Sequence, residues 1–279
     1  MRALATDLKP NRQIVHRGRG TTHGPITRLM SPGDLGRLLK PFVFLDLFDI
    51  GAASPPIGLH PHSGIATLTY VAEGSIAYED TTGATGLLRT GGVEWMRAGA
   101  GVWHGGGVGP DGRTRGFQLW IALPPDLELG APRSLYQAAE DIPQAGPARV
   151  LLGRHDGKAN AIEPPSDITY LAISLSAGQR WTFRPPAGHD VLWIAVGKGV
   201  VEAGERLREG EIVVFAPGQE AVTFEAVGQT EFVLGSAVPH KHPLVLGYYS
   251  VHTSIEALHA GESQIQRIRH RLTAEGRLI

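Results

Sequence analysis

The chain has 279 residues, with 26 Lys and Arg against 27 Asp and Glu, so its formal charge is −1 when histidine is neutral. This near-zero balance lacks the basic excess of nucleic-acid-binding proteins, and no run of about 18 apolar residues indicates a membrane span. Because cysteine is absent, disulfides, thiolate metal sites and a cysteine nucleophile are excluded. No basic segment followed by an apolar one opens the chain, so we expect a cytoplasmic protein.

With 37 glycines, 20 prolines and 42% hydrophobic residues, the composition favours a turn-rich, all-β globular protein. Short apolar segments recur between Gly, Pro and Asp residues, a pattern that is typical of β-sandwiches and barrels. In chain order we predict strands at Phe42–Phe48, Ile65–Ala72, Ser75–Glu79, Val93–Met96, Gly116–Leu123, Arg149–Leu152, Ile168–Leu175, Asp190–Val196, Glu211–Phe215, Ala221–Glu225 and Thr230–Ala237.

The segment from Pro124 to Pro143 interrupts these strands and has the composition of a connector. We therefore predict two domains, residues 1–140 and 141–279. The alternative is one continuous β domain with a long surface loop.

The two halves look like diverged copies of one pattern. The first contains V-A-E-G-S-I (Val71–Ile76) and then G-V-E-W-M-R-A-G (Gly92–Gly99), and the second contains A-V-G-K-G-V (Ala195–Val200) and then G-E-I-V-V-F-A-P-G (Gly210–Gly218). In each half we predict a tight glycine turn between two strands. Chance similarity between glycine-rich hairpins is the alternative.

A helix is predicted near the end of the chain. Thr253-x-x-Glu256 fits a capping box, in which the Thr hydroxyl accepts from a free backbone amide. Apolar residues then recur at helical spacing and form one face that we expect to pack on a sheet: Ile255, Leu258, Ile265, Ile268 and Leu272.

Three of the twelve histidines form a pattern that suits a metal. His60 and His62 belong to H-P-H, and in an extended segment residues i and i+2 point to the same side. His104 follows a glycine-containing turn and a short strand, so a hairpin could return it beside the first pair. Three neutral imidazoles make a set suited to Fe, Ni, Cu, Zn or Mn. The alternative is three unrelated histidines.

The segments around these histidines closely resemble the pirin family. H-P-H-S-G-I-A-T-L-T-Y-V-A-E-G (His60–Gly74) and G-G-V-E-W-M-R-A-G-A-G-V-W-H (Gly91–His104) carry the resemblance, and Lys40–Phe48 and Gly247–Ala257 look like further landmarks of the family. The resemblance implies a bicupin, which is two jelly-roll-type β-sandwich barrels with a metal only in the N-terminal one. It also implies a mononuclear iron-type site, quercetin 2,3-dioxygenase activity in some members and transcription co-regulation in animal ones.

By this resemblance the family's three histidine ligands correspond to His60, His62 and His104. The family's usual Glu ligand, two residues after the last histidine, corresponds to Gly106, and a second acidic position corresponds to Ala66. We expect a site without carboxylates to bind metal more weakly, or not at all, and to attract an anionic substrate more strongly. Replacing Gly106 with Glu is then expected to tighten metal binding if the family's geometry is kept, and no gain would indicate that Gly105–Gly107 follow a different path.

Two other carboxylates are considered as substitutes. The strand Val93–Met96 is apolar on either side of Glu94, which argues against Glu94 as a ligand or base, and Glu73 falls in a predicted turn where we expect it to be solvated.

Three functions remain open from the sequence. The first is a metal-dependent dioxygenase of the quercetin 2,3-dioxygenase type, with Fe(II) as the first choice and Ni, Mn, Cu and Zn as alternatives, acting with O2 on a small aromatic or enediol substrate. The second is a non-catalytic, redox-responsive or regulatory binding protein with a degenerate metal site. The third is a metal-assisted isomerase or hydrolase. Since protonated imidazole does not ligate, metal affinity is expected to fall as the pH drops through about 6.

Overall fold

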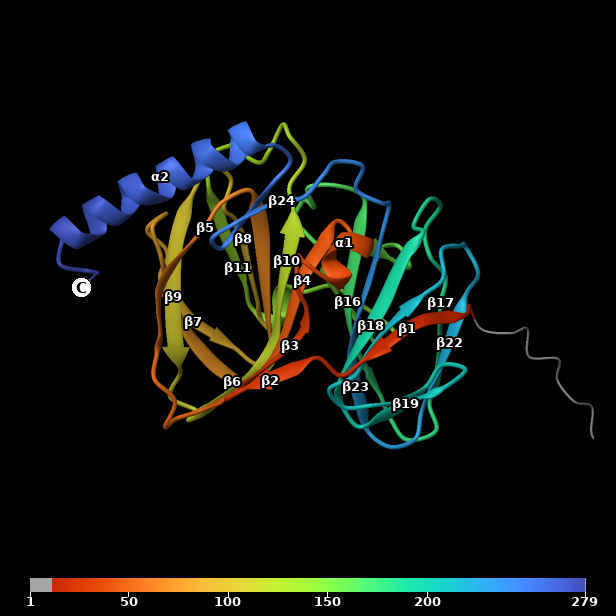
Figure 1. The fold of residues 1–279 in the computed structure, drawn as a ribbon. Helices are drawn as coiled ribbons and strands as arrows, with labels where there is room; N and C mark the ends of the chain where they lie inside the picture. The colour runs from red at the N-terminus through yellow and green to blue at the C-terminus, as the bar shows by residue number, and fades with distance from the viewer. Residues whose placement is uncertain (1–11, 279) are drawn as a thin grey trace, which may run out of the picture.

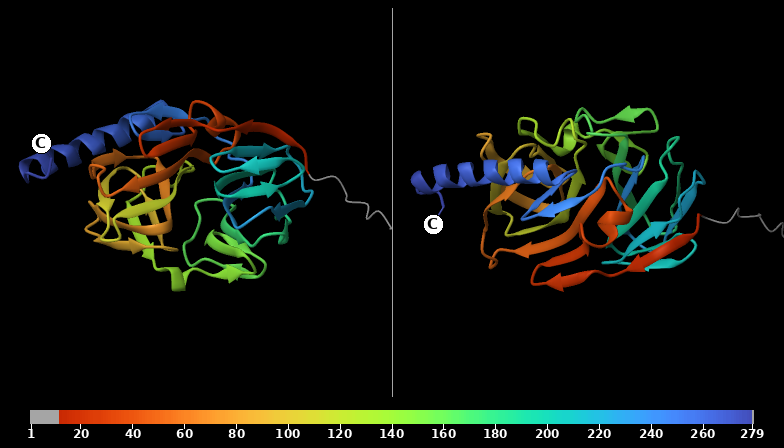
Figure 2. Two further views of the ribbon diagram at one scale, coloured as in Figure 1. Left: turned by 90° about the horizontal axis from the view of Figure 1, so that it is seen from below. Right: turned by 45° about the horizontal axis from the view of Figure 1, so that its top comes forward.

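The computed structural model describes residues 12–278 and confirms the predicted all-β class (Figure 1). Two β-sandwiches lie side by side, as the view from below in Figure 2 shows. In the described residues, helical structure is confined to α1 (Leu35–Leu38), the 3-10 turn η1 (Ala139–Asp141) and α2 (Ile255–Ala274).

The first sandwich is built around the long strand β6 (Ile65–Asp80), which pairs with strands of both of its layers. One layer has the strand order β11-β8-β6-β10-β4-β3-β2, and the other is formed by β5, β9, the second half of β6 and β7. The remaining bounds are β2 (Thr21–His23), β3 (Ile26–Met30), β4 (Phe42–Gly51), β5 (Ile57–His62), β7 (Thr85–Arg89), β8 (Val93–Arg97), β9 (Val102–Val108), β10 (Arg113–Ala122) and β11 (Arg133–Gln137).

The tight turn predicted at Gly74 is wrong, because β6 continues through this residue as a single strand. Gly74 has φ +78°, and a Cβ there would lie 1.9 Å from the carbonyl oxygen of Arg113. Only glycine fits such a position without strain. The glycine therefore bends one strand from the first layer into the second, where Ser75–Glu79 pair with β7.

The second sandwich repeats this plan. Its larger sheet has the order β1-β21-β18-β23-β16-β13-β12, and its smaller sheet has the order β17-β22-β19-β20. Gly199, with φ +79°, stands where β18 gives way to β19, as Gly74 does within β6. The bounds are β12 (Gln144–Ala145), β13 (Ala148–Leu152), β14 (Arg154–His155), β15 (Lys158–Ala159), β16 (Ile168–Leu175), β17 (Arg180–Phe183), β18 (Val191–Lys198), β19 (Val200–Glu202), β20 (Arg206–Arg208), β21 (Ile212–Phe215), β22 (Val222–Ala226) and β23 (Thr230–Ala237).

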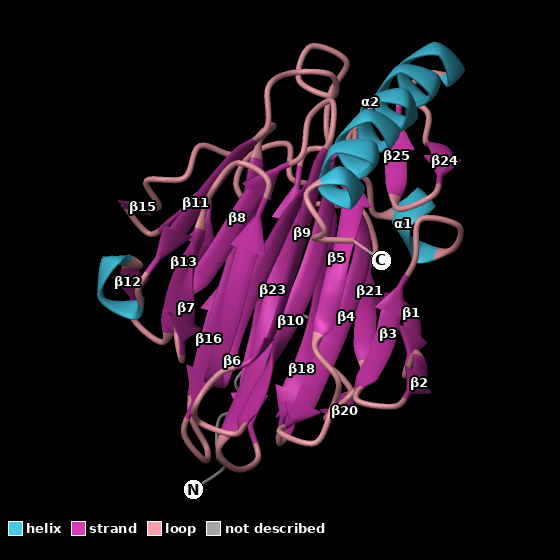
Figure 3. Ribbon diagram, turned by 90° about the vertical axis from the view of Figure 1, so that its left-hand side faces the viewer, coloured by secondary structure: helices cyan, strands magenta, loops and turns pink. Residues whose placement is uncertain are grey.

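Segments near the two ends of the chain cross between the sandwiches. β1 (Ile14–Gly18) pairs with β21 of the second sandwich, whereas α2 packs on the first one. Figures 1 and 3 show α2 along the outside of the first sandwich. In sequence, β11 is the last strand of the first sheet and β12 is the first new strand of the second. A domain boundary at residue 140 stays a prediction.

The largest apolar cluster lies between the two large sheets, so each sandwich covers a face of the other. Leu68 and Phe117 of the first sandwich belong to it, as do Tyr170 and Trp193 of the second. A separate cluster fills the interior of the second sandwich. Burial of this much apolar surface is the main term that holds the halves together.

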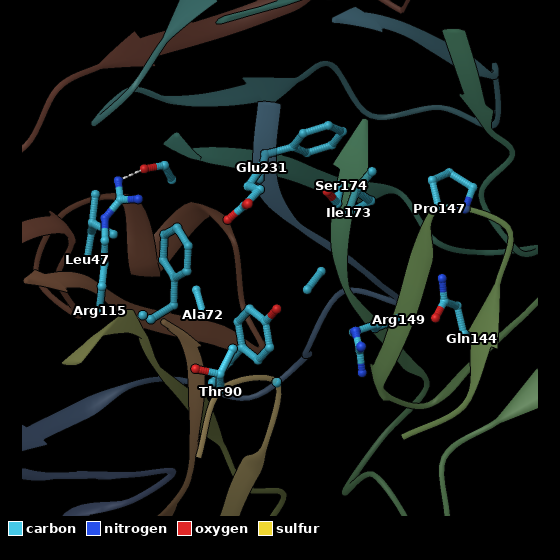
Figure 4. A pocket seen from close by; sticks show the side chains of 17 residues that line it. Leu47, Ala72, Thr90, Arg115, Gln144, Pro147, Arg149, Ile173, Ser174 and Glu231 are labelled. Carbon is cyan, nitrogen blue, oxygen red and sulfur yellow. Dashed lines mark hydrogen bonds between the residues drawn. The ribbon is translucent and has the colours of Figure 1, made fainter. Parts of the chain in front are cut away.

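Polar groups line a cavity of about 440 Å³ beside this interface (Figure 4). The buried Arg115 donates to the carbonyl oxygen of Gly197 and forms an ion pair with Glu209 at 2.9 Å, so one arginine of the first sandwich is fixed by the second. Arg149 and Glu231 also line the cavity.

Helix α2 begins one residue later than predicted. Ser254 is its N-cap, and its hydroxyl accepts from the backbone amide of Ala257, whereas Thr253 binds the carboxylate of Glu128. The predicted apolar face is buried against Trp103 and neighbouring side chains, except for Ile255, which is exposed. In the described part of the chain, neither helix has the length and apolar character needed to cross a bilayer.

Candidate metal centre

Two paired strands carry the three predicted ligands. His60 and His62 lie on β5, and His104 lies on the antiparallel strand β9, directly opposite His60. The ring centroids of His60 and His62 are 5.1 Å apart, and that of His104 is 4.4 Å from His60 and 5.0 Å from His62. One nitrogen atom of each ring lies within 4.8 Å of the other two. The three side chains could therefore hold one ion.

Each imidazole is oriented by a hydrogen bond from its Nδ1 atom. His60 Nδ1 donates to the carbonyl of Gly58 at 3.0 Å, and His62 Nδ1 donates to the carbonyl of Tyr249 at 3.0 Å. His104 Nδ1 lies 3.3 Å from Oε1 of Glu94. With the proton on Nδ1, the lone pair is on Nε2, and the Nε2 atom of His104 is buried without a partner among the described residues. This is the arrangement that metal-binding histidines adopt.

Burial keeps two of the histidines neutral. Burial, and after it the neighbouring His104, lower the pKa of His60 to about 4. The pKa of His62 is well below its ordinary value, chiefly because of burial and then because of His104 and His60. Both rings are therefore neutral and have a free lone pair at neutral pH, and they become protonated at a lower pH than the value of about 6 expected from the sequence.

The three histidines open into a cavity of about 390 Å³ inside the first sandwich. Most of its wall is apolar, and the rings of Phe44 and Trp120 stack there at 4.1 Å. The Trp120 ring also meets the His62 ring edge-on, with centroids 4.8 Å apart. Gln118 adds a polar group, and its Nε2 atom has no hydrogen-bond partner among the described residues. An apolar cavity with a few polar groups is typical of a small-molecule site.

The turn between β24 (Val245–Gly247) and β25 (Ser250–His252) reaches the same cavity from the C-terminal part of the chain. Tyr249 has φ +54°, an uncommon conformation for a residue with a side chain. Its carbonyl accepts from His62, and its ring lies 5.7 Å from the His60 ring. Tyr249 lies in the segment Gly247–Ala257 that resembles the family, but its contact with the histidines joins segments far apart in the chain and could not be predicted from the pattern.

Glu94 is not grouped with the three histidines, so the expectation that it is neither ligand nor base stays a prediction, but the structure places it beside His104. Its side chain is buried beside His104, and its Oε2 accepts from the hydroxyl of Thr69 at 2.6 Å. Burial opposes its ionisation, but the hydrogen bonds from His104 and Thr69 keep the pKa of Glu94 below its usual range. A charged residue between two apolar ones in a strand is the signal that could have found it. Glu73, in contrast, is exposed.

The two positions without carboxylates differ in what they could accommodate. At Gly106 a Cβ atom would lie 2.2 Å from the carbonyl oxygen of Ala77, so a glutamate does not fit without a shift of the backbone. The expected gain in metal affinity on Gly106→Glu required the family's geometry at this position, and this backbone does not provide it. Ala66 belongs to the cluster between the two sheets and not to the cavity wall.

Other histidines do not join the group. His240 and His242 have ring centroids 5.2 Å apart, but no third ligand completes them in the described residues. His252 hydrogen-bonds Ser63 and Glu128 in the interior, which suits a structural role.

The comparisons with known proteins agree with this geometry. The sequence profile of the family named Pirin matches residues 25–121. A pirin-like protein of Caulobacter vibrioides is 32% identical over 252 residues, which cover 85% of this chain and 90% of the relative. The chain belongs to the pirin family.

Solved structures related to the family show the same fold. The crystal structure of a quercetin 2,3-dioxygenase from Acinetobacter baumannii has a TM-score of 0.80 and 26% identity, and the match covers 92% of this chain and 94% of that one. A bacterial pirin of Escherichia coli in complex with nickel(II) has a TM-score of 0.64 and 23% identity, with 82% and 98% covered. This member of the pirin family is thus a bicupin, as the sequence resemblance implied.

Proposed function

We propose that this chain is a metal-dependent dioxygenase of the quercetin 2,3-dioxygenase type. His60, His62 and His104 hold one divalent ion, Fe(II) in the first place and Ni, Mn, Cu or Zn as alternatives. The observation that carries the proposal is the buried, unpartnered Nε2 of His104 beside two neutral imidazoles. A bound ion of this kind supplies Lewis-acid and redox chemistry toward O2 and a chelating substrate.

The walls of the cavity support an aromatic substrate with adjacent oxygen atoms. Phe44 and Trp120 offer flat apolar surfaces next to His62, where a planar ring can stack. One end of the Gln118 amide contacts the Thr69 hydroxyl, and the other end is free to bind an oxygen-bearing group of the substrate. The name of the Acinetobacter baumannii structure points to the same class of substrate.

Oxygen uptake is the direct test. Metal-free protein is loaded anaerobically with Fe(II), Mn, Ni or Cu in turn, and quercetin and O2 are then added. We expect uptake with at least one metal, and its loss in His60→Ala. His240→Ala, in the separate His240/His242 pair, is the matched control and should keep full activity. Absence of uptake with all four metals contradicts the proposal.

A regulatory binding protein is the second candidate, and Gly106 favours it. The closed space at this residue leaves no room for the carboxylate that the family usually places there. On this reading the protein binds one metal per chain, yet oxygen uptake with a flavonol stays at background. The same experiment therefore separates the two candidates.

A further inference from the structure

Glu94 is a buried carboxylate whose only ion-pair partner among the described residues is His104. In the described part of the chain its hydrogen bonds go to Thr69 and to His104, and no Lys or Arg pairs with it. Only 7% of the residue is exposed. A buried charge that lacks an opposite charge destabilises a folded protein. The cation that would balance it belongs on the far side of the His104 ring, next to the unpartnered Nε2.

The three histidines differ in the group that orients them. His60 and His62 each donate to a neutral main-chain carbonyl, whereas His104 faces a carboxylate. A carboxylate behind a metal-binding imidazole fixes its orientation and makes the ring a stronger donor. Of the three, His104 alone is oriented by a charged group.

Gly106, which stands where the family usually has a Glu ligand, supports a role for Glu94 at the histidines. Gly106 lies on β9, two residues from His104, and the backbone of Ala77 closes the space beside it. Glu94 lies on β8, and its backbone pairs with Thr69 of β6. The carboxylate nearest to the histidines thus comes from a different strand, and reaches His104 by a hydrogen bond.

We propose that Glu94 is a positioning residue for the metal: it holds His104 with Nε2 toward the ion and offsets one unit of the ion's charge through the imidazole. The proposal rests on the proposed metal site. It also names Thr69 as a support, because the Thr69 hydroxyl fixes the second oxygen of the same carboxylate.

The test compares metal affinity with the stability of the metal-free protein. Glu94→Gln keeps the shape and an acceptor oxygen but removes the charge. We expect its affinity for Ni(II), measured by calorimetric titration, to fall about 10- to 100-fold. The same variant should unfold at equal or higher denaturant concentration than the wild type when metal-free, because the unbalanced charge is gone. A residue with only a structural role would instead lower the stability of the metal-free protein.

Further variants sharpen the result. Glu94→Asp keeps the charge with a shorter side chain and should bind Ni(II) with intermediate affinity, which also covers a failure of Glu94→Gln to fold. Thr69→Val should show a smaller loss, and Glu73→Gln, at an exposed carboxylate, should show none. If the wild type binds Ni(II) and Glu94→Gln binds it equally well, the inference is wrong and the metal site stands. If the wild type itself binds no Fe(II), Mn, Ni(II) or Cu, the proposed function fails first.

Discussion

The two sandwiches place different side chains on the same framework. In the first, β5 pairs with β9, which pairs with the strand beyond Gly74; in the second, β17 pairs with β22, which pairs with the strand beyond Gly199. His60 stands opposite His104 in the first pair, and Trp181 stands opposite Phe224 in the second.

The corresponding interiors are hollow in one case and filled in the other. Two residues after Trp181 comes Phe183, as His62 follows His60, and these aromatic side chains belong to or pack against the interior cluster of the second sandwich. The Trp181 and Phe224 centroids are 5.8 Å apart, and the Trp181 and Phe183 centroids are 6.1 Å apart. The same strand pair thus borders a cavity with three imidazoles in one sandwich and a packed aromatic core in the other.

The largest expected effect is on metal affinity, when a histidine of the first sandwich is replaced by the aromatic residue found at the corresponding position of the second. His62→Phe introduces the residue type found at Phe183 and removes one nitrogen donor. Since the loss of a hydrogen-bond partner behind a metal ligand alone costs about 10- to 100-fold in metal affinity, removing a ligand should lower the affinity by at least about 100-fold. Elemental analysis of protein dialysed against excess metal measures the outcome, with His240→Phe as control.

The fold should survive this change, because phenylalanine suits an apolar cavity wall. One equivalent of tightly bound metal in folded His62→Phe protein would show that the ion is held elsewhere.

Removing an aromatic side chain from the filled interior should have the next largest effect. Phe224→Ala leaves a void among fully packed neighbours and should lower the free energy of unfolding by about 3–5 kcal/mol. Phe44→Ala should cost at least ~1 kcal/mol less, because Phe44 already borders the cavity of the first sandwich and loses fewer contacts. Urea denaturation of the metal-free variants gives both values. Equal losses in the free energy of unfolding for the two variants would contradict the conclusion that the second sandwich is packed more fully than the first.

How much of the fold and of the candidate metal site could be predicted from the sequence depends on whether the interactions involved are local or long-range along the chain. The apolar segments between glycines predicted most strands correctly, since alternation and β-branching are local properties, and the spacing of His60 and His62 brought their rings to one side. Gly74 was misjudged because a turn and a bend need the same backbone conformation. The pairing of β6 with β7 and β9 decides between them, and this pairing is long-range.

The burial of Glu94 beside His104 could not be predicted for a related reason. A polar residue that alternates with Val93 and Trp95 ordinarily faces solvent. Here Val93 and Trp95 face the second sandwich, and the opposite face of the strand lines an interior cavity, so no side of β8 is fully exposed. A sequence pattern does not distinguish a hollow interior from solvent, because both accept a polar side chain. The crossing of β1 and α2 between the sandwiches likewise depends on contacts between distant segments.

The pH dependence of stability should show a smaller difference between the sandwiches, since imidazoles titrate and the aromatic side chains at Trp181 and Phe183 do not. The pKa of His60 is about 4 in the folded protein and about 6.5 when exposed. Between these values the unfolded chain binds a proton that the folded chain excludes. The metal-free protein therefore has its full stability above about pH 6.5 and loses it as the pH falls toward 4.

At about pH 5 the contribution of His60 amounts to a loss of about 2 kcal/mol relative to neutral pH, and His62 adds to it in the same direction. Burial also lowers the pKa of His155, His240 and His252, so the whole protein will show a larger dependence. The difference between wild type and His60→Phe isolates one group. Urea denaturation of both at about pH 7 and about pH 5 should find the variant less sensitive by about 2 kcal/mol. An equal sensitivity would mean that His60 is already solvated in the metal-free protein, and that its cavity is open to water before any ion binds.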